Sequence, residues 1–470
     1  MIRSAVRTAA LLALAACDGP FVPPPSYPPG PAVPATVVVL PDSGTVTMDD
    51  TLRLTATVRD SLGATLTGVA VSWVSADTTI AVPVNALGTV RGQRPGVTRI
   101  RAYAGTAVGA VTVFVTPVVY TSFSAGADHV CAVANNQHAY CWGNNDDAEV
   151  GTGASSLVEP VPRLVALAPA LRAVTAGGAH SCALDPGGIA YCWGREVNGR
   201  LGRDGTPGDP AIPTAVVTGL HFDALAAGGA HSCGLTTTGR AACWGADALG
   251  QLGDGGVVDR TTPQAVIGDS TWRTITTGTL HTCALTADST AACWGANASG
   301  QIGDGTLVDR PLPTAVTSTL RYAAISAGGG HTCAVTGGGA ATCWGRNTRG
   351  QTGTGLPDST LALPTSVAGG LQFQSIAAGG EHTCGIAADG SAYCWGANTS
   401  GQLGDSSRTD RALPVPVVGG LHFLVVQAGA AFTCGLTTTL VLYCWGDGTQ
   451  GQLGRTALGT SVVPVKVAGQ

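Results

Sequence analysis

The chain has 470 residues, enough for two or three domains. Only 11% of them are charged, the net charge is −5, and Lys466 is the single lysine, so no basic stripe or tail could gather phosphates. Nucleic acid is therefore not an expected partner. The 68 glycines and the few helix-forming residues predict an all-β protein of short strands joined by tight turns.

The first 17 residues read MIRSAVRTAALLALAAC, with Arg3 and Arg7 ahead of a short apolar run. The run is too short to span a bilayer, which favours an export signal over a transmembrane helix. Its end, Leu14-Ala15-Ala16-Cys17, resembles the lipobox of bacterial lipoprotein signals, which are cut just before the cysteine. The resemblance implies that residues 1–16 are removed, that Cys17 carries a lipid, and that the chain is anchored in the bacterial cell envelope, at the outer membrane on its periplasmic side or at the cell surface. A secretory signal without a lipid is the alternative.

Residues 17–35 are a proline-rich linker, reading DGPFVPPPSYPPGPAVPA after the cysteine. A segment of this composition cannot build a core and favours an extended polyproline conformation. Behind a lipid anchor it would hold the folded part away from the membrane, and a disordered tether is the alternative interpretation.

Residues 36–116 predict a first folded unit, which contains no cysteine. Short runs such as VVVL, LRLTATVRD, VAVSWVS and AVTVFV alternate apolar with polar or small residues, which is typical of half-buried antiparallel strands. The stretches TLRLTA (51–56), VSWVSAD (71–77) and GVTRIRA (96–102) resemble the bacterial immunoglobulin-like group-two domain. The resemblance implies a β-sandwich with Trp73 in its core. Such domains are surface spacers or adhesive modules, and a spacer is expected here.

A seven-fold repeat fills residues 117–470. All cysteines except Cys17 form C-x9-C pairs that follow one another at intervals of 50 or 51 residues, and the second cysteine of each pair opens a C-W-G triplet. The pairs are Cys131 and Cys141, Cys182 and Cys192, Cys233 and Cys243, Cys283 and Cys293, Cys333 and Cys343, Cys384 and Cys394, and Cys434 and Cys444. So many regularly placed thiols indicate an oxidising, exported compartment.

The phase of the repeat predicts a small sheet that is apolar on both faces. A run such as HTCAL predicts one strand and AACWG predicts its return, so that Cys293 and Trp294 point to opposite faces. Both faces then need a neighbour, which a ring of blades supplies. The two cysteines of a pair lie opposite each other if the turn has an odd number of residues. Disulfides within the hairpins are therefore expected rather than zinc sites, whose paired cysteines usually have about two to four residues between them.

The motifs AGGAHSC (227–233), CWG (243–245) and GQLGDG (250–255) resemble the regulator-of-chromosome-condensation repeat, and the seven copies cover three quarters of the chain. The resemblance implies a seven-bladed β-propeller over residues 117–470, after the immunoglobulin-like β-sandwich. The first copy deviates at Glu149-Val150-Gly151, and the last has Phe432 in place of histidine. Residues 462–467 are expected to close the ring as a β-clasp on the first blade, with Pro117-Val118-Val119 as a partial eighth copy of the P-x-x-V segment.

Six histidines recur in phase, at His129, His180, His231, His281, His331 and His382. A ring of imidazoles could bind a metal or sense pH, but a repeated structural position favours a hydrogen bond inside each blade. The GQLGDG turns lack the lysine and helix of a phosphate loop, and each offers at most one carboxylate to calcium. Tight turning is their expected role, and no metal or cofactor is expected. Asp259-Arg260 and its in-phase copies predict a salt bridge at the blade rim or a solvated loop.

The sequence shows no set of serine, histidine and acid, no paired carboxylates and no unpaired thiol in the repeats, so we do not expect an enzyme. We expect a monomer that binds a protein or a glycan through loops on a rigid scaffold. The loops that depart most from the repeat are residues 152–159, 203–210 and 356–361. The candidate contacts in them are Thr152, Glu159, Arg203, Asp209, Leu356 and Asp358.

Three other functions stay open. Inhibition of an exported enzyme rests only on analogy to a bacterial β-lactamase-inhibitory protein with the same repeat type. The eukaryotic founder of the repeat family suggests guanine-nucleotide exchange or chromatin binding, against which the export signal, the cysteine pairs and the missing basic tail argue. A catalytic role would need a substrate pocket on the propeller axis.

Overall fold

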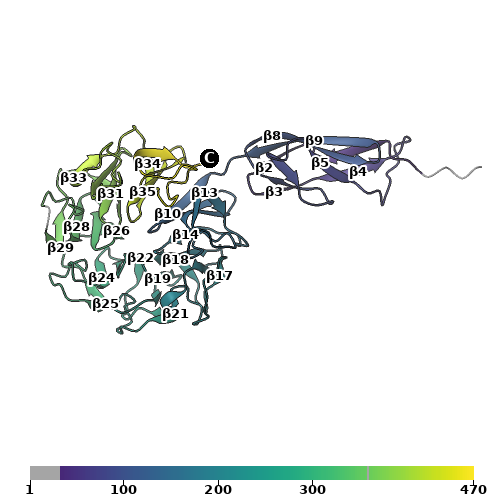
Figure 1. The fold of residues 1–470 in the computed structure, drawn as a ribbon. Helices are drawn as coiled ribbons and strands as arrows, with labels where there is room; N and C mark the ends of the chain where they lie inside the picture. Colours follow the sequence, from purple (N-terminus) through teal and green to yellow (C-terminus); the bar gives the residue numbers. More distant parts are fainter. Residues whose placement is uncertain (1–31, 357–358) are drawn as a thin grey trace, which may run out of the picture.

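The computed structural model describes residues 32–356 and 359–470 (Figure 1). The predictions for the export signal, for Cys17 and for Asp358 fall outside these ranges, as does most of the proline-rich linker. Within them the chain is all-β, apart from a 3-10 turn at Val197–Gly199 (η1). None of the elements described there is a helix long and apolar enough to cross a membrane.

An N-terminal β region comes first. Its strands are β1 (Thr36–Leu40), β2 (Ser43–Thr47), β3 (Thr51–Arg53), β4 (Thr55–Arg59), β5 (Ser72–Ser75), β6 (Ala81–Pro83), β7 (Thr89–Gly92), β8 (Gly96–Ala104) and β9 (Ala107–Thr116). They form the sheets β2-β9-β8-β5 and β3-β7-β6 and the pair β1-β4. Alternate residues of β9, among them Val111, Val113 and Val115, are buried in the core of this region. Trp73 is half-buried at the edge of that core, where its Nε1 donates to Ala86 O (3.3 Å).

Seven four-stranded antiparallel sheets follow and stand as blades around a ring (Figure 1). In each blade, numbered one to seven in chain order, the four strands are consecutive in sequence and neighbours in the sheet. The first strand lies nearest the centre of the ring and the fourth lies at the rim, as β22 and β21 show in Figure 1. The strands are β10 (Tyr120–Ala125), β11 (His129–Ala134), β12 (Ala139–Asn144) and β13 (Val158–Leu164); β14 (Ala173–Ala176), β15 (His180–Leu184), β16 (Ala190–Gly194) and β17 (Thr214–Ala215); β18 (Phe222–Ala227), β19 (His231–Thr236), β20 (Ala241–Gly245) and β21 (Arg260–Ala265); β22 (Trp272–Thr277), β23 (His281–Thr286), β24 (Ala291–Gly295) and β25 (Arg310–Ala315); β26 (Tyr322–Ala327), β27 (His331–Thr336), β28 (Ala341–Arg346) and β29 (Thr360–Ser366); β30 (Phe373–Ala378), β31 (His382–Ala387), β32 (Ala392–Gly396) and β33 (Arg411–Pro416); β34 (Phe423–Ala428), β35 (Phe432–Thr437), β36 (Leu442–Gly446) and β37 (Ser461–Lys466).

Neighbouring blades share their hydrophobic cores. Trp294 of blade four is fully buried in a cluster that includes Leu235 and Leu252 of blade three. On the other face of the same blade, Leu285 packs in a cluster with Trp344 of blade five. Each blade is therefore covered on both faces, as the opposite directions of the cysteine and tryptophan side chains predict.

Every predicted cysteine pair forms a disulfide inside its blade. The register of β11 and β12 sets the two cysteines of blade one opposite each other, and the other six hairpins repeat this register. The Cα atoms of Cys131 and Cys141 lie 4.1 Å apart, so their side chains meet across the hairpin. The disulfides are buried and join the second strand to the third. In chain order, the bonds join Cys131 with Cys141, Cys182 with Cys192, Cys233 with Cys243, Cys283 with Cys293, Cys333 with Cys343, Cys384 with Cys394, and Cys434 with Cys444.

The ring closes without an exchange of strands, so the expected β-clasp is wrong. β37 pairs antiparallel with β36 as the fourth strand of blade seven, with Val465 opposite Cys444, as the fourth strands of the other blades do. Pro117-Val118-Val119 belongs to no strand, although Val118 is buried at the seam. A shared core holds the seam between blades seven and one, and it contains Val130 and Phe432.

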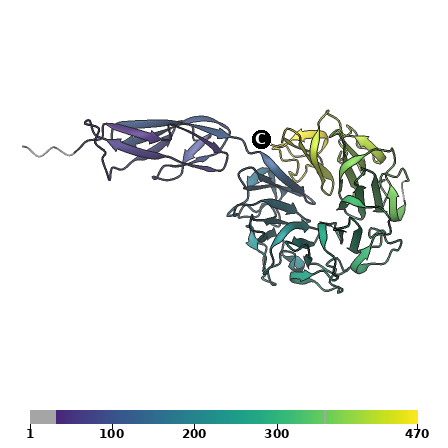
Figure 2. The ribbon, with the colours of Figure 1, turned by 180° about the vertical axis from the view of Figure 1, so that it is seen from behind.

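The N-terminal β region extends from the edge of the ring as an arm, in both views (Figure 1, Figure 2). The Met48 carbonyl oxygen accepts hydrogen bonds from Tyr140 Oη (3.4 Å) and Asn136 Nδ2 (3.5 Å) of blade one. Asn136 lies in the turn between β11 and β12. The arm therefore contacts the face of the ring that carries the turns between second and third strands.

Candidate functional site

The ring has two faces, at the two ends of its strands. The turns between second and third strands lie on the face that contacts the N-terminal region. The turns between first and second strands and the connections from third to fourth strands lie on the other face, which we call the pocket face. A pocket of about 490 Å³ lies there on the axis, lined by the turns that follow the first strands.

A closed belt of main-chain hydrogen bonds surrounds this pocket. The seven bonds run from each blade to the next, as Ala127 N to Gly177 O, Gly178 N to Gly228 O, Gly229 N to Gly278 O, Thr279 N to Gly328 O, Gly329 N to Gly379 O, Gly380 N to Gly429 O and Ala430 N to Ala127 O, with lengths of 2.9 to 3.2 Å. The close approach explains the glycine that every repeat carries five residues before the first cysteine. A Cβ on Gly228 would lie 2.7 Å from Gly278 O and 2.5 Å from the His231 ring.

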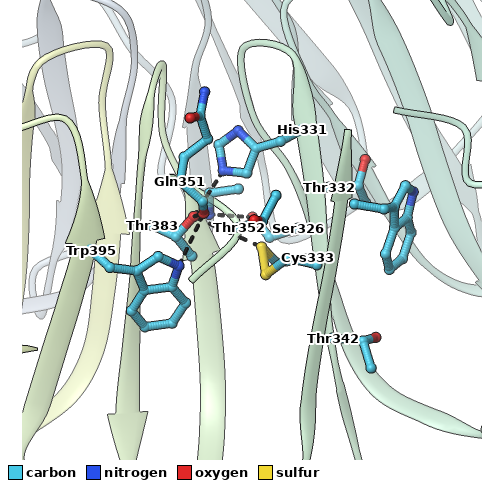
Figure 3. Close-up of a disulfide and its surroundings, with 12 residues drawn as sticks. Ser326, His331, Thr332, Cys333, Thr342, Gln351, Thr352, Thr383 and Trp395 are labelled. Atoms are coloured by element: carbon cyan, nitrogen blue, oxygen red, sulfur yellow. Dashed lines mark hydrogen bonds between the residues drawn. A yellow bond between two sulfur atoms is a disulfide. The ribbon is translucent and has the colours of Figure 1, made fainter. Parts of the chain in front are cut away.

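The six recurring histidines connect neighbouring blades. His331 Nε2 lies 2.8 Å from Thr383 Oγ1 of the next blade, and that hydroxyl donates to Gln351 O (2.8 Å) (Figure 3). Because the hydroxyl proton goes to the carbonyl, the neutral imidazole donates through Nε2–H. The other pairs are His129–Ser181, His180–Ser232, His231–Thr282, His281–Thr332 and His382–Thr433. We expected each histidine to form a hydrogen bond inside its own blade, and this is wrong. The bonding partner belongs to the next blade, which the ring geometry brings closer.

Burial keeps these histidines neutral. All six are fully buried, and in the described ranges their Nδ1 atoms have no hydrogen-bond partner. Desolvation lowers the pKa to about 4 for His129, His281 and His382 and to about 3 for His231 and His331, and it lowers the pKa of His180 well below its usual value. Among the described residues, no group of three or more His, Cys, Asp or Glu side chains could hold a metal ion. The histidines therefore join blades rather than face a ligand.

The seam between blades seven and one replaces the polar pair with an apolar one. Phe432 stands at the histidine position, and Val130 stands where the following blade otherwise has serine or threonine. Both side chains are fully buried in the same core. Phe432→His alone would leave a buried imidazole without its hydroxyl partner, at a cost of roughly 1–3 kcal/mol. The deviation in the last copy is therefore matched by one in the first copy.

The G-Q-L-G type turns fit around the tryptophan of the next blade. Gly353 has φ of +69°, and a Cβ on it would lie 2.7 Å from Trp395 Nε1. The same Nε1 donates to Gln351 O (3.0 Å) (Figure 3). The C-W-G and G-Q-L-G motifs thus form the two sides of one contact between blades. The predicted tight turning is confirmed by the positive φ.

The carboxylates of these turns pair with arginines of their own loops. Arg260 Nε contacts Asp254 Oδ2 (2.7 Å) rather than its sequence neighbour Asp259, which accepts a hydrogen bond from Asp247 N (2.9 Å). Asp304 with Arg310 and Asp405 with Arg411 repeat the pairing. The salt bridge expected between the adjacent residues Asp259 and Arg260 is therefore wrong, because Arg260 pairs with Asp254 instead.

The axial pocket departs from seven-fold symmetry at blade two. Glycines and alanines form most of its wall, together with Leu280 and two threonines. Among the described residues that line it, only Arg195 and Arg200 are ionisable. Arg195 follows the C-W-G triplet, and Arg200 takes the glutamine position of the G-Q-L-G turn.

Arg200 is 6% exposed, and its guanidinium donates from Nε to Val197 O (2.9 Å) and from Nη1 to Gly229 O (3.4 Å). Burial lowers the pKa of Arg200 below its usual value, and the charge of Arg195 acts in the same direction. Arg195 is half-exposed, and its Nη1 lies 3.6 Å from Asp147 Oδ2. The blade-two wall of the pocket therefore carries positive charge.

The described residues of the three loops that the sequence singles out all lie on the pocket face. Each connects a third strand to a fourth strand and is one residue longer than its counterparts in blades three, four, six and seven. Cys192 lies opposite Thr214, for example, whereas Cys243 lies opposite Gln264. The longer connections are those of blades one, two and five.

The candidate contacts in these loops mostly bind their own chain. Arg203 Nη1 donates to Gly208 O (2.7 Å), and Asp209 Oδ1 accepts from Glu196 N (2.7 Å). Thr152 likewise donates to Ala154 O, Glu159 pairs with Arg163, and Leu356 is 58% exposed. Sequence analysis missed Arg195 and Arg200 as pocket residues. The sequence feature that could have indicated them is Arg200, an arginine at the glutamine position of the G-Q-L-G turn in blade two.

Comparisons with known proteins agree with this architecture. Residues 156–469 match the RCC1-like domain, and residues 120–148 match the regulator of chromosome condensation (RCC1) repeat. The chain is 32% identical over 143 residues to the ultraviolet-B receptor UVR8 of Arabidopsis thaliana, covering 30% of this chain and 32% of that protein. It is 29% identical over 133 residues to the human probable E3 ubiquitin-protein ligase HERC6, covering 27% and 13%. The matched part thus spans about a third or less of these relatives.

Solved structures show the same fold. Human WBSCR16 superposes with a TM-score of 0.64 at 19% identity, covering 70% of this chain and 94% of that chain. Prp20p of Saccharomyces cerevisiae superposes with a TM-score of 0.64 at 23% identity, covering 74% and 87%. Since the domain match runs through blades one to seven, this chain belongs to the family of proteins with an RCC1-like domain.

Proposed function

We propose that this chain is an exported binding module that holds a protein or glycan partner on the pocket face of its propeller. One observation carries the proposal: the departures from seven-fold symmetry in loop length and in pocket charge gather on that face. They are the three longer connections and the two arginines of the axial pocket. Irregular loops on a rigid scaffold and a concave pocket with few polar groups are typical of binding sites.

The placement of the N-terminal region supports this choice of face. Met48 contacts the turn at Asn136, on the opposite face, so the arm leaves the pocket face free. We propose that the arm is an immunoglobulin-like spacer and that Cys17 anchors it to the membrane through a lipid. A partner would then meet the pocket face at a distance from the membrane.

The seven disulfides support an exported location, because buried pairs of this kind form in oxidising compartments. The roles of the relatives, as an ultraviolet-B receptor and a probable E3 ubiquitin-protein ligase, belong to proteins that this chain matches over about a third of their length or less. We carry over from them only the use of the propeller as a scaffold, and we propose binding rather than catalysis.

A retention experiment with matched loop exchanges tests the proposal. The oxidised full chain is immobilised and exposed to envelope extract and culture medium of the source cells. In one variant, residues 203–210 are replaced by the corresponding loop of blade three, residues 254–260. In the control, the turn at residues 237–239 on the opposite face is replaced by residues 337–339. A partner retained by the wild type and the control, but lost from the first variant, supports the pocket face. A partner that is lost only from the control contradicts it.

A further inference from the structure

We propose that the axial pocket binds the carboxylate group of an acidic ligand, held by Arg195 and Arg200. The inference deepens the proposed function, since it names the chemistry that a partner would present to the pocket face. It rests on a comparison of blade two with its sister blades, which serve as internal references for the same positions.

Arg200 replaces a residue with a fixed structural role in five other blades. The glutamine there accepts a hydrogen bond through Oε1 from the amide two residues before it, as Gln251 does from Leu249 N (2.9 Å). The other four are Gln301, Gln351, Gln402 and Gln452. A guanidinium has no acceptor, so Arg200 cannot perform this role. The change introduces a positive charge into the wall of the pocket and gives up a contact that the other turns repeat.

The charge of Arg200 lacks an ion-pair partner among the described residues. Its Nε and Nη1 donate to main-chain carbonyls, and Nη2 makes no hydrogen bond within the described ranges. Asp147, Glu196 and Asp209 are the carboxylates whose charge reaches it, and none lies within ion-pair distance of it. A buried cation without an anion is costly, which favours the entry of one.

Arg195 and Arg346 occupy the same position in blades two and five, after the C-W-G triplet. Arg346 Nη1 lies 3.5 Å from Glu381 Oε1, and Arg346 does not line the pocket. Arg195 lines the pocket beside Arg200, with Asp147 at 3.6 Å as its partner. The Nη2 group of Arg200 and the guanidinium of Arg195 therefore offer N–H donors on one wall for the two oxygens of a carboxylate.

The rest of the wall indicates a compact aliphatic acid rather than a sugar. The lining consists of glycine, alanine, threonine and Leu280, and among the described residues it contains no aromatic side chain on which a sugar ring could stack. A volume of about 490 Å³ admits a glutamate-sized group. The carboxylate could belong to an acidic side chain of a protein partner or to a free short acid, and the two sources need separate experiments.

The first experiment titrates glutarate into the oxidised full chain by calorimetry, with three variants. Arg200→Gln restores the residue of the sister blades and should fold, Arg195→Ala removes the second donor, and Arg346→Ala is the matched control. We expect glutarate to bind the wild type and the control, with affinity at least about tenfold lower for R200Q and R195A and falling with salt. Equal binding by R200Q and the wild type would overturn the inference, as would equal affinity for inorganic phosphate.

The second experiment repeats the retention assay with R200Q and R346A. A partner that is lost only from R200Q supports the inference and places the carboxylate on the partner. If R200Q retains a partner that the loop exchange releases, the proposed function stands. If, in addition, the wild type does not bind glutarate, this inference is overturned. R200Q-sensitive glutarate binding without any retained partner supports a free acid as the ligand and counts against the proposed macromolecular function. Absence of both glutarate binding and an R200Q-sensitive partner overturns the inference.

Discussion

At the scale of single residues, blade three carries a buried carboxylate where blade four carries an amide. Asn297 Nδ2 of blade four donates to Thr306 O and Val308 O, at 3.1 Å each. Asp247 of blade three is fully buried; its Oδ1 accepts from Leu252 N (2.9 Å), but its Oδ2 has no partner among the described residues. Burial raises the pKa of Asp247 to about 6. The sequence position is repeated, whereas the hydrogen-bonding chemistry is not.

We expect Asp247→Asn to raise the free energy of unfolding at pH 7.5 by about 1–3 kcal/mol, because the amide can donate to the loop acceptors. The folded carboxyl keeps its proton up to about pH 6, whereas the unfolded one loses it near pH 4. Wild-type stability therefore falls relative to the variant as pH rises between about 4 and 6. Chemical denaturation at pH 4.5 and 7.5 measures both effects. Asn297→Asp is the reverse control and should destabilise; equal stability of D247N and wild type at pH 7.5 would refute the assignment.

At the scale of elements, the seam between β35 and β11 can be tested by exchanging both members of its apolar pair. Phe432→His alone should lower the free energy of unfolding by about 1–3 kcal/mol, because it buries an unpaired imidazole. Val130→Thr alone should cost less, because its hydroxyl can donate to Gln452 O as the corresponding hydroxyls do in the other blades. The double variant recreates the histidine–hydroxyl pair of the other blades. We expect a coupling free energy of about 1–2 kcal/mol in a double-mutant cycle. Strict additivity of the two changes would show that the groups do not meet.

The hairpin disulfides offer a second test at this scale. Replacing Cys283 and Cys293 together with alanine removes the link between β23 and β24. In the chain-entropy model a closed loop of this size contributes about 2–3 kcal/mol to the free energy of unfolding. The variant should lose this free energy, and its denaturation midpoint should move to a lower denaturant concentration. The same double change in blade six, at Cys384 and Cys394, should cost a similar amount. No change in either variant would mean that the packed cores alone fix the hairpins.

The elements were predictable where a motif marks a contact that every blade repeats. The C-x9-C spacing fixed the hairpin register, and C-W-G and G-Q-L-G mark two sides of one packing contact. The partner of β37 was not predictable, because the P-x-x-V sequence suits blade one and blade seven alike. The histidine bonds also depend on the curvature that brings the next blade near. Arg195 and Arg200 resemble ordinary variation in a repeat until the closed ring places them on the wall of one pocket.

At the scale of the whole molecule, the six bonds between blades make the stability of the ring depend on pH. Five of the buried histidines stay neutral in the folded state down to a pKa of about 3 or 4, and the pKa of His180 is lowered in the same direction, whereas the unfolded chain takes up a proton at each near pH 6.5. The unfolded state therefore binds more protons below pH 6.5, and the free energy of unfolding falls as pH decreases, by up to about 1.4 kcal/mol per unit for each histidine. The raised pKa of Asp247 changes the free energy of unfolding in the opposite direction with pH, but this is the effect of one group, whereas six histidines act together.

Denaturant unfolding of the oxidised chain at pH 7.5 and pH 5.0 measures this dependence. The wild type should lose on the order of 10 kcal/mol between the two values, or about 2 kcal/mol per histidine, since five to six extra protons bind on unfolding at pH 5.0. His281→Gln removes one of the six, keeps a donor toward Thr332, and should reduce the proton uptake by about one. His422→Gln changes an exposed histidine outside the ring of bonds and serves as the matched control. A free energy of unfolding that is equal at both pH values would show that the imidazoles between the blades can take up protons without separating them. That result would favour the alternative that the six histidines sense pH.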